Sequence, residues 1–415
     1  MTDDYKRKYD KKWNFKEHSM KELVHGLHPY PAMMMPLIAR TMFQKYGKGN
    51  ETIFFDPYVG SGTTLVEAQY YGAKKAIGVD LNPLAILISR TKTEPIDLVK
   101  VEKLINEFDK YIDTAGPVEA PEFSIRDSWF NERSISELAK IRAFILAIKD
   151  EPVKDFFKVA FSETTRLASE TRNGEFKLYR MSKASLAKFD PHPIEMFKEI
   201  IRRNHEILKS VDYKRETEIV LYTENTIDTI DNHKELNEAV DLIITSPPYG
   251  DSHTTVAYGQ FSRLSNEWLD IPEAGQLDRK LLGGARTKDK FFDIPELDNA
   301  ILQIRENDKQ FNRDRSWEVV AFYSDYQESL KSVAKTVKHG GVVVYVVGNR
   351  RVRNIELPLD VITYKMFEKM GFTHIETHVR DILNKRMPSK ASPSNAVGGQ
   401  IPTMTAEYIV VMKKN

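Results

Sequence analysis

The chain has no cysteine among its 415 residues. Disulfide bonds, thiolate metal ligands and covalent catalysis by a cysteine nucleophile are therefore excluded. The sequence also lacks any apolar run near the roughly 18 residues that a membrane-spanning helix needs. Residues 1–12 are charged and have no apolar core, unlike a secretory signal. We therefore expect a cytoplasmic protein with no membrane association and no metal site.

An excess of charge of one sign is also missing. The chain has 61 lysines and arginines against 60 aspartates and glutamates, a net charge of +1. Such a molecule does not attract nucleic acid as a whole, so any nucleic-acid binding has to rely on local basic patches. Hydrophobic residues make up 41% and charged residues 29%, which is typical of a folded soluble protein.

Short apolar segments alternate with helical periodicity along much of the chain. Such alternation indicates an α/β fold with a mostly parallel sheet that is covered by helices on both faces. The last two segments follow the final predicted helix and suggest an antiparallel hairpin at one edge of the sheet. The predicted strands are residues 51–55, 75–79, 218–222, 241–245, 341–347, 373–379 and 407–412.

The pattern divides the chain into three parts. Residues 1–100 form an N-terminal arm and the first half of the α/β core. Residues 101–215 have helical periodicity and few strand signals, so we expect a helical insertion. Residues 216–415 form the second half of the core, with a loop-rich insertion at about 251–316.

A glycine-rich turn joins the first predicted strand to a helix that begins near Thr63. Gly60 and Gly62 allow the backbone to turn sharply and to approach a ligand without a Cβ in the way. Asp80 follows the next strand, where its carboxylate can accept hydrogen bonds from both hydroxyl groups of a ribose. A tight turn alone could be structural, but together with Asp80 it predicts a nucleoside-binding site.

Asp56 discriminates between two kinds of nucleoside cofactor. A nicotinamide dinucleotide carries a pyrophosphate, which a carboxylate at this strand end would repel. The spacing Gly-Ser-Gly-Thr also differs from the G-x-G-x-x-G pattern of dehydrogenases. S-adenosylmethionine instead carries a positive charge and an amino group, which a carboxylate can bind. We therefore predict S-adenosylmethionine as the cofactor and rank a nicotinamide oxidoreductase last.

A second motif, Ser246-Pro247-Pro248-Tyr249, comes directly after the strand at 241–245. The two prolines hold the chain rigid and extended. The Ser246 hydroxyl and the Pro247 carbonyl can accept the two hydrogens of an exocyclic amino group, which turns its lone pair toward a methyl donor. Tyr249 offers a face on which a flipped-out base can stack. The same residues could merely stiffen a loop, but beside a nucleoside site they predict methylation of an amine.

The two motifs, in this order, resemble the amino-methyltransferase family of DNA modification enzymes. Ser-Pro-Pro-Tyr is typical of the cytosine-N4 branch of the restriction-modification methyltransferases, whereas adenine-N6 enzymes more often have Asp or Asn at the first position. The resemblance implies a Rossmann-like S-adenosylmethionine-dependent fold and methyl transfer to N4 of a cytosine flipped out of double-stranded DNA. Methylation at C5 of cytosine requires a thiol and is excluded.

The resemblance also assigns cofactor contacts. Residues 25–32 resemble the motif that closes over the methionine end of the cofactor, and Tyr58 stands where phenylalanine is common. The acidic residue that contacts the adenine ring has no clear counterpart, so we place it at Glu224 or Asn225. The predicted cofactor site comprises His28, Pro29, Tyr30, Asp56, Tyr58, Gly60, Gly62, Thr63, Asp80, Leu81, Asn82, Glu224 and Asn225.

Residues that contact DNA are expected outside the two motifs. Basic residues position phosphates, and arginine can read guanine edges. The insertion contains a basic stretch with interleaved aromatic residues, which suits this role or, equally, a solvated helix face. The candidates are Arg166, Arg172, Lys177, Arg180, Arg286, Lys385 and Arg386.

Three other functions compete with cytosine-N4 methylation. The first is adenine-N6 methylation of DNA, because the family tolerates exchange of the target base. The second is guanine-N2 methylation of transfer RNA, which would need an RNA-binding domain before the cofactor motif. Only 55 residues precede Asp56. The third is an inactive DNA-binding homologue. The family role further implies a cognate restriction endonuclease, and we expect a monomer or a weak dimer.

Overall fold

The computed structural model describes residues 5–172, 174–211, 216–251, 255–311, 314–382 and 404–415, and the backbone of 390–391 and 401–402. Eight strands form one large sheet in the order β1-β9-β12-β6-β5-β2-β3-β4. β12 runs antiparallel to β6 and β9, whereas the other described pairings in this sheet are parallel. The strands are β1 (Arg7–Tyr9), β2 (Ile53–Asp56), β3 (Lys75–Val79), β4 (Glu218–Tyr222), β5 (Val240–Thr245), β6 (Val337–Val347), β9 (Phe372–Asp381) and β12 (Ala406–Lys414).

These strands confirm the predicted α/β class and its mostly parallel sheet. The predicted edge hairpin needs a correction in its position. β9 and β12 pair antiparallel as expected, but the short strand β1 from the N-terminal arm adds to β9 and forms the edge. The Arg7 guanidinium fixes this arm, because it donates to the Asp360 carboxylate at 2.8 and 3.0 Å.

Alternate residues of each central strand belong to two different apolar cores. Phe54 packs in the core on the side of α1 and α2, whereas its neighbour Phe55 packs on the side of α14. Because both faces are buried, the strands are apolar throughout. One face is covered by α1 (Pro36–Tyr46), α2 (Thr63–Tyr71) and α3 (Pro83–Thr93), the other by α10 (Thr229–Asn232), α14 (Ser316–Thr336) and α15 (Leu359–Glu368).

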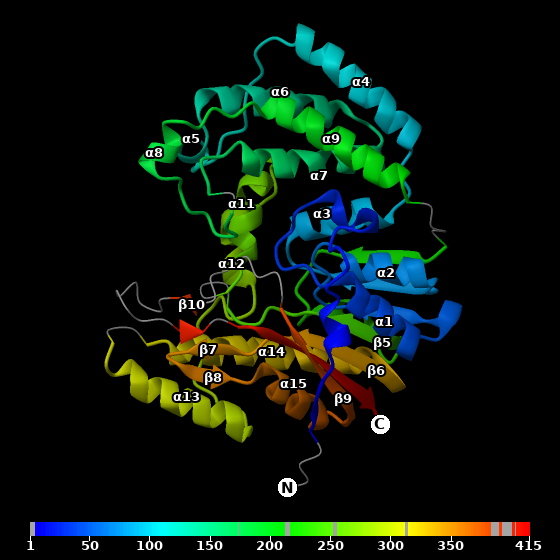
Figure 1. The fold of residues 1–415 in the computed structure, drawn as a ribbon, viewed down its shortest axis with the longest axis vertical. Helices are drawn as coiled ribbons and strands as arrows, with labels where there is room; N and C mark the ends of the chain where they lie inside the picture. The colour runs from blue at the N-terminus through cyan, green and yellow to red at the C-terminus, as the bar shows by residue number, and fades with distance from the viewer. Residues whose placement is uncertain are drawn as a thin grey trace.

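A layer of helices with its own apolar core forms one end of the molecule (Figure 1). Side-chain caps begin four of these helices: Asp97, Asn131, Asp150 and Ser182 each accept from a backbone amide of the first turn. The layer begins at Leu98, near the start of the helical insertion expected over residues 101–215. Its helices are α4 (Leu98–Thr114), α5 (Arg126–Trp129), α6 (Glu132–Ala147), α7 (Glu151–Leu167), α8 (Lys183–Leu186) and α9 (Pro193–Lys209).

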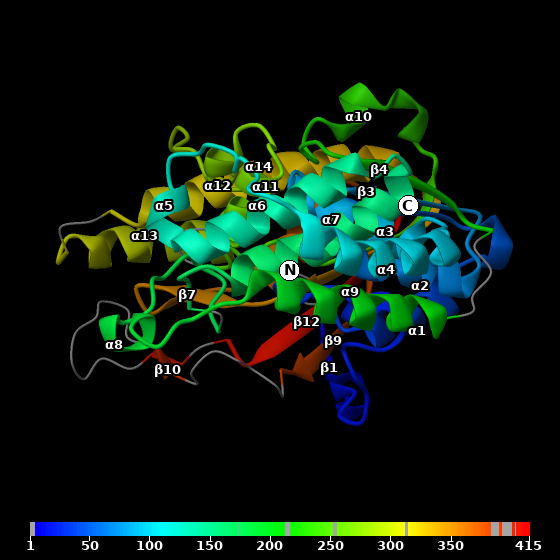
Figure 2. The ribbon, with the colours of Figure 1, turned by 90° about the horizontal axis from the view of Figure 1, so that it is seen from above.

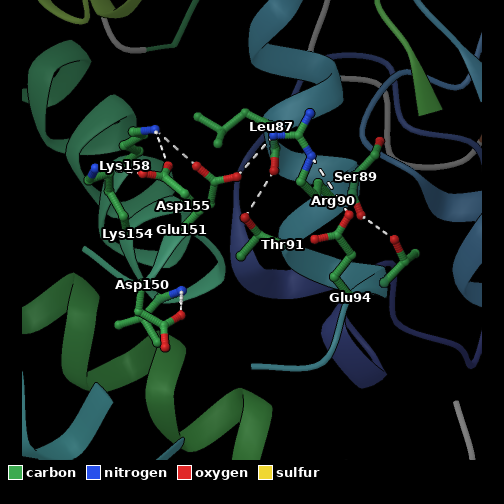
Figure 3. Close-up of polar contacts among 12 residues, drawn as sticks. Leu87, Ser89, Arg90, Thr91, Glu94, Asp150, Glu151, Lys154, Asp155 and Lys158 are labelled. Atoms are coloured by element: carbon green, nitrogen blue, oxygen red, sulfur yellow. Dashed lines mark hydrogen bonds and ion pairs between the residues drawn. The ribbon is translucent and has the colours of Figure 1, made fainter. Parts of the chain in front are cut away.

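Ion pairs join this helical layer to the α/β core. Arg90 of α3 donates to the Asp155 carboxylate of α7 at 3.1 Å, and Asp155 also pairs with Lys158 at 3.1 Å (Figure 3). Glu94 lies 3.8 Å from the Arg90 guanidinium and Glu151 lies 3.8 Å from the Lys158 ammonium. The Asp155 side chain is almost fully buried, so its charge depends on these partners. The network fixes α7 against α3.

The segment at 251–316 is more helical than predicted. It contains α11 (Tyr258–Trp268), α12 (Leu277–Lys280) and α13 (Pro295–Asp308). α13 buries Leu297, Ile301 and Ile304 at helical spacing, which its many charged residues obscured in the sequence. α11 runs from the core to the helical layer and places Trp268 in the apolar core of that layer (Figure 1).

The remaining described elements are short. Figure 2 shows that the helices α13 and α8 extend to one side of the molecule. Among the described residues, no helix combines the length and apolarity that crossing a membrane would take. The remaining strands and 3-10 helices are β7 (Arg350–Val352), β8 (Ile355–Leu357), β10 (Lys390–Ala391), β11 (Ile401–Pro402), η1 (Lys11–Asn14), η2 (Leu23–Leu27), η3 (Gly49–Glu51), η4 (Lys234–Leu236) and η5 (Ala274–Gln276).

Candidate active site

A pocket opens at the carboxyl ends of four neighbouring parallel strands, β4, β3, β2 and β5. This is where α/β proteins bind their ligands. It encloses about 860 Å³ of space between atoms, part of it open to solvent. The predicted residues that line it are Tyr30, Asp56, Tyr58, Gly60, Thr63, Asp80, Leu81, Glu224, Asn225, Ser246 and Pro248.

Asp80 is held at the end of β3 by two backbone amides. Gly60 and Asn82 donate to its carboxylate oxygens at 3.0 and 2.8 Å. Gly60 has a positive φ of 51°, a conformation that glycine adopts without strain, and this brings its amide to Asp80. Each carboxylate oxygen keeps a lone pair for a ligand hydroxyl. The Asp80 carboxylate is therefore fixed at the edge of the pocket, and its contact with a ribose stays a prediction.

Asp56 connects the cofactor motif to the catalytic motif. Its carboxylate accepts from the hydroxyl groups of Thr64 and Thr245, each at 2.5 Å, and from the Tyr58 amide at 3.0 Å. Thr245 directly precedes Ser246. Burial raises the pKa of Asp56 to about 6, against the effect of these three hydrogen bonds. The side chain thus fixes the two motifs relative to each other as well as lining the pocket.

Tyr30 and Tyr258 form an aromatic wall of the pocket. Their rings stack with centroids 6.1 Å apart and planes 23° apart. Asn82 caps α3 by accepting from the Leu84 amide, and its amide nitrogen donates to the Tyr30 hydroxyl at 3.0 Å. Such a wall can hold the apolar and aromatic parts of a ligand next to the Asp80 carboxylate.

Four predicted cofactor residues lie outside the residues that line the pocket. His28 is buried behind it and shares a 3.0 Å hydrogen bond with Ser162 of α7, and burial lowers its pKa to about 3. Pro29 is exposed, and Asn82 acts through Tyr30. Gly62 instead allows α2 to approach α3, because a Cβ there would lie 2.9 Å from the Ser89 Cα.

The two residues proposed for the adenine contact both line the pocket. The Glu224 carboxylate accepts from the Asn232 side chain at 2.9 Å and lies 3.2 Å from the His233 ring nitrogen. The His233 ring stacks on Tyr222 at the end of β4, with centroids 3.7 Å apart. Neighbouring groups therefore hold Glu224 in place, and its contact with the cofactor stays a prediction.

The catalytic motif meets the pocket through Ser246 and Pro248, whereas Pro247 and Tyr249 are not among the residues that line it. The Tyr249 hydroxyl lies 3.1 Å from the Ser246 hydroxyl and donates to the Glu407 carboxylate at 3.1 Å. Burial raises the pKa of Tyr249 well above its usual value, and the charge of Glu407 adds to this effect. Tyr249 is therefore neutral and protonated at physiological pH.

The predicted DNA-contacting residues differ in exposure and in their present contacts. Arg166 packs over the Phe261 ring and donates to the Phe261 and Glu175 carbonyls, so it contributes to the packing of α7 against α11. Arg172 and Arg180 are exposed and pair with Glu175 and Glu170, and Arg286 is exposed beside Trp317. Lys177 is partly buried, which lowers its pKa. Lys385 and Arg386 lie outside the described residues.

Several residues of the site were not found from the sequence. Met33, Met34, Thr226, Tyr258, Lys280, Leu281 and Leu282 also line the pocket. Met33 and Met34 follow the segment at 25–32, which was a usable signal, but Tyr258 and Lys280 come from the segment interpreted as loop-rich. Among the described residues, no cluster of histidine, aspartate or glutamate is suited to hold a metal ion.

The parallel sheet, the pocket at its carboxyl ends and the Ser-Pro-Pro-Tyr motif in the same pocket as Asp80 together define an S-adenosylmethionine-dependent methyltransferase. The chain is 37% identical over 422 residues to the type II methyltransferase M.MvaI of Kocuria varians, covering 95% of this chain and 91% of that protein. It therefore belongs to the type II methyltransferases, which are DNA methyltransferases of the restriction-modification kind. Their methyl donor, and hence the cofactor of this protein, is S-adenosylmethionine.

Other similarities are shorter or more distant. The type II methyltransferase M.MjaII of Methanocaldococcus jannaschii is 34% identical over 82 residues, which is 20% of this chain and 15% of that protein. Among solved structures, the rRNA methyltransferase aviRa of Streptomyces viridochromogenes aligns over 94% of this chain and 90% of its own, with 12% identity and a TM-score of 0.32. No family model matches the chain.

The affinity for S-adenosylmethionine is expected to depend on pH. Burial raises the pKa of Asp80 to about 6, and the nearby Asp56 adds to the shift, whereas the Asn82 and Gly60 amides oppose it. Protonation removes the charge and part of the acceptor capacity, so binding should weaken about tenfold per pH unit below pH 6. Isothermal titration calorimetry between about pH 5 and 8 measures this dependence.

Protonation of Asp80 does not destabilise the fold, so acid unfolding through this residue would not imitate the loss of affinity at low pH. A carboxyl group with a raised pKa stabilises the folded state at low pH, and this stabilisation is lost as the pH rises through about 6. The Asp80→Asn variant should bind more weakly at pH 8 and show a flatter profile. A wild-type affinity that stays constant from pH 8 to pH 5 would refute the role of Asp80.

Proposed function

We propose that this protein methylates the exocyclic N4 amino group of cytosine in double-stranded DNA, at a base flipped out of the helix. One observation carries the proposal: Ser246 and Pro248 line the same pocket as Asp80 and Gly60. A base that enters beside Ser246 therefore comes next to a cofactor whose ribose is bound by Asp80. The Ser-Pro-Pro-Tyr motif favours cytosine over adenine as the target.

The cofactor supplies an electrophilic methyl group on a positively charged sulfur. The contribution of the protein is to make the amino group of the base nucleophilic. Its lone pair is delocalised into the ring, and acceptance of its two hydrogens by the Ser246 hydroxyl and the Pro247 carbonyl favours a tetrahedral nitrogen. Attack by this lone pair would form the nitrogen–carbon bond as the carbon–sulfur bond breaks and leave a neutral thioether, and the proton lost from the amino group would pass to water. Tyr249 flanks this position and is proposed to stack on the base.

The helical layer from α4 to α9 is the proposed target-recognition region. It reaches the site through α11, which begins with the pocket residue Tyr258 and packs on α7. Arg172, Arg180 and Arg286 are exposed and can exchange their present contacts for phosphates. We further propose a cytoplasmic enzyme, a monomer or a weak dimer, that protects host DNA from a cognate restriction endonuclease.

Nucleoside mass spectrometry tests the proposal. Purified protein and S-adenosylmethionine are incubated with mixed-sequence double-stranded DNA or with total RNA, and each digest is compared with the same reaction using Ser246→Ala. We expect N4-methylcytosine in the DNA digest. N6-methyladenine would overturn the choice of base, and methylguanine in the RNA digest alone would overturn the choice of nucleic acid. Saturable cofactor binding with no product would indicate an inactive homologue.

A further inference from the structure

A chain of four polar side chains runs from the strand pair β9–β12 into the catalytic motif. Arg380 of β9 and Glu407 of β12 are direct partners in the strand register. The Arg380 guanidinium donates to one Glu407 carboxylate oxygen at 3.0 Å, and the Tyr249 hydroxyl donates to the other at 3.1 Å. The Ser246 hydroxyl lies 3.1 Å from the Tyr249 hydroxyl. The chain ends at the target pocket.

The direction of every hydrogen bond in this chain follows from the first two residues. Glu407 forms an ion pair with Arg380, and a carboxylate only accepts hydrogen bonds. The single hydrogen of Tyr249 therefore goes to Glu407, so the Tyr249 oxygen can only accept from Ser246. The hydrogen of Ser246 is thereby used, and Ser246 presents lone pairs alone to the pocket.

We propose that Arg380 and Glu407 are positioning residues that fix the hydroxyl of Ser246 as an acceptor, so that the target pocket selects an amino group and rejects a carbonyl group. This rests on the proposed function, in which Ser246 contacts the target base. A base with an amino group at this position donates two hydrogens and is accepted. A base with a carbonyl oxygen there, such as uracil, would place two acceptors against each other.

The surrounding structure keeps these four hydrogen-bonded side chains in place. The Arg380 and Glu407 side chains are only 11% and 20% exposed, so water competes little for their contacts. Gly348, just after β6, leaves room for the Tyr249 ring, because a Cβ there would lie 2.8 Å from its Cδ2 atom. The high pKa of Tyr249 keeps its hydrogen available for Glu407.

Glu407→Gln tests the proposal because a glutamine at this position can reverse the direction of the hydrogen bonds to Tyr249 and Ser246. Its oxygen is expected to face the Arg380 donor, which turns its NH2 group toward Tyr249. Tyr249 then donates to Ser246, and the Ser246 hydrogen points into the pocket. Compared with wild type, we expect a kcat at least about tenfold lower and S-adenosylmethionine affinity within about twofold. The preference for cytosine over uracil should fall at least about tenfold or invert.

The assay uses duplexes that contain the site methylated by the wild type, mapped by sequencing, with cytosine or uracil opposite guanine at the target position. Binding of both duplexes is measured for wild type, Glu407→Gln, Tyr249→Phe and the control Glu356→Gln. Glu356 belongs to an exposed ion pair with Arg351 and should leave the preference unchanged. Tyr249→Phe removes the acceptor for Ser246 and should also lower the preference.

The outcomes separate this proposal from the proposed function. Wild-type methylation of cytosine with an unchanged preference in both site variants would overturn the positioning role alone. Equal weakening of both duplexes would show a merely structural role and overturn it too. If Glu407→Gln does not fold, Tyr249→Phe decides. If the wild type methylates adenine, the two duplexes carry adenine and hypoxanthine at the target position instead. If the wild type methylates no base, both proposals fail.

Discussion

Replacement of Ser246 by alanine is expected to lower kcat by about 100-fold or more while the affinity for S-adenosylmethionine stays within about twofold. Loss of one preorganised hydrogen-bonding group that acts on the reacting atom typically costs this much. Ser246 lines the pocket beside the cofactor residues, and its hydroxyl is the acceptor that the chain of Glu407 and Tyr249 orients. Single-turnover methyl transfer and calorimetry separate the two effects.

A control of the same residue type is Ser332→Ala, which removes the hydroxyl group of a buried serine on α14 outside the site. This variant should keep the wild-type kcat. Ser246→Ala with wild-type kcat would show that the hydroxyl group is not needed for methyl transfer. Equal losses of kcat and cofactor affinity would instead assign Ser246 to cofactor binding.

Asp80→Ala is expected to weaken S-adenosylmethionine binding by about 100-fold or more at pH 8. Each hydrogen bond to a charged group contributes about 1.5–3 kcal/mol, and a carboxylate that accepts from both ribose hydroxyls makes two. The alanine also removes the acceptor of the Gly60 and Asn82 amides, so the turn at Gly60 loses a fixed position. Calorimetric titration with S-adenosylmethionine measures the affinity.

Asp80→Asn distinguishes these two contributions, because it keeps the shape of the side chain and removes the charge. Its affinity should lie between those of the wild type and the alanine variant. At saturating cofactor, both variants should retain most of the wild-type kcat, since Asp80 acts on binding. Wild-type affinity in Asp80→Ala would mean that the ribose is bound elsewhere and that the nucleoside site was assigned wrongly.

The parts of the site that the sequence predicted are those encoded by neighbouring residues. A strand followed by Gly60 and Gly62 has few conformations available, and two prolines after an apolar strand fix the backbone at Ser246. The order of the strands then brings Asp56, Asp80 and Ser246 to one edge, because the carboxyl ends of parallel strands meet there. Local patterns were therefore enough for the core of the pocket.

The residues that the sequence did not predict arrive through tertiary packing. Glu407 reaches Tyr249 because β12 runs antiparallel beside β6, and nothing near residue 407 indicates that neighbourhood. Tyr258 lines the pocket because α11 docks on α7. His28 resembled a cofactor contact, but α7 covers it and Ser162 binds its ring. Each outcome depends on long-range packing that a local motif does not contain.

The place of β12 in the sheet has a consequence for synthesis of the protein. This strand comes last in the described chain, yet it lies between β6 and β9 and carries a residue that contacts the catalytic motif. A nascent chain can form β2 and β3 early, but the sheet stays open between β6 and β9 until residues 406–414 have been synthesised. The hydrogen bond from Tyr249 to Glu407 therefore forms only after residues 406–414 have been synthesised.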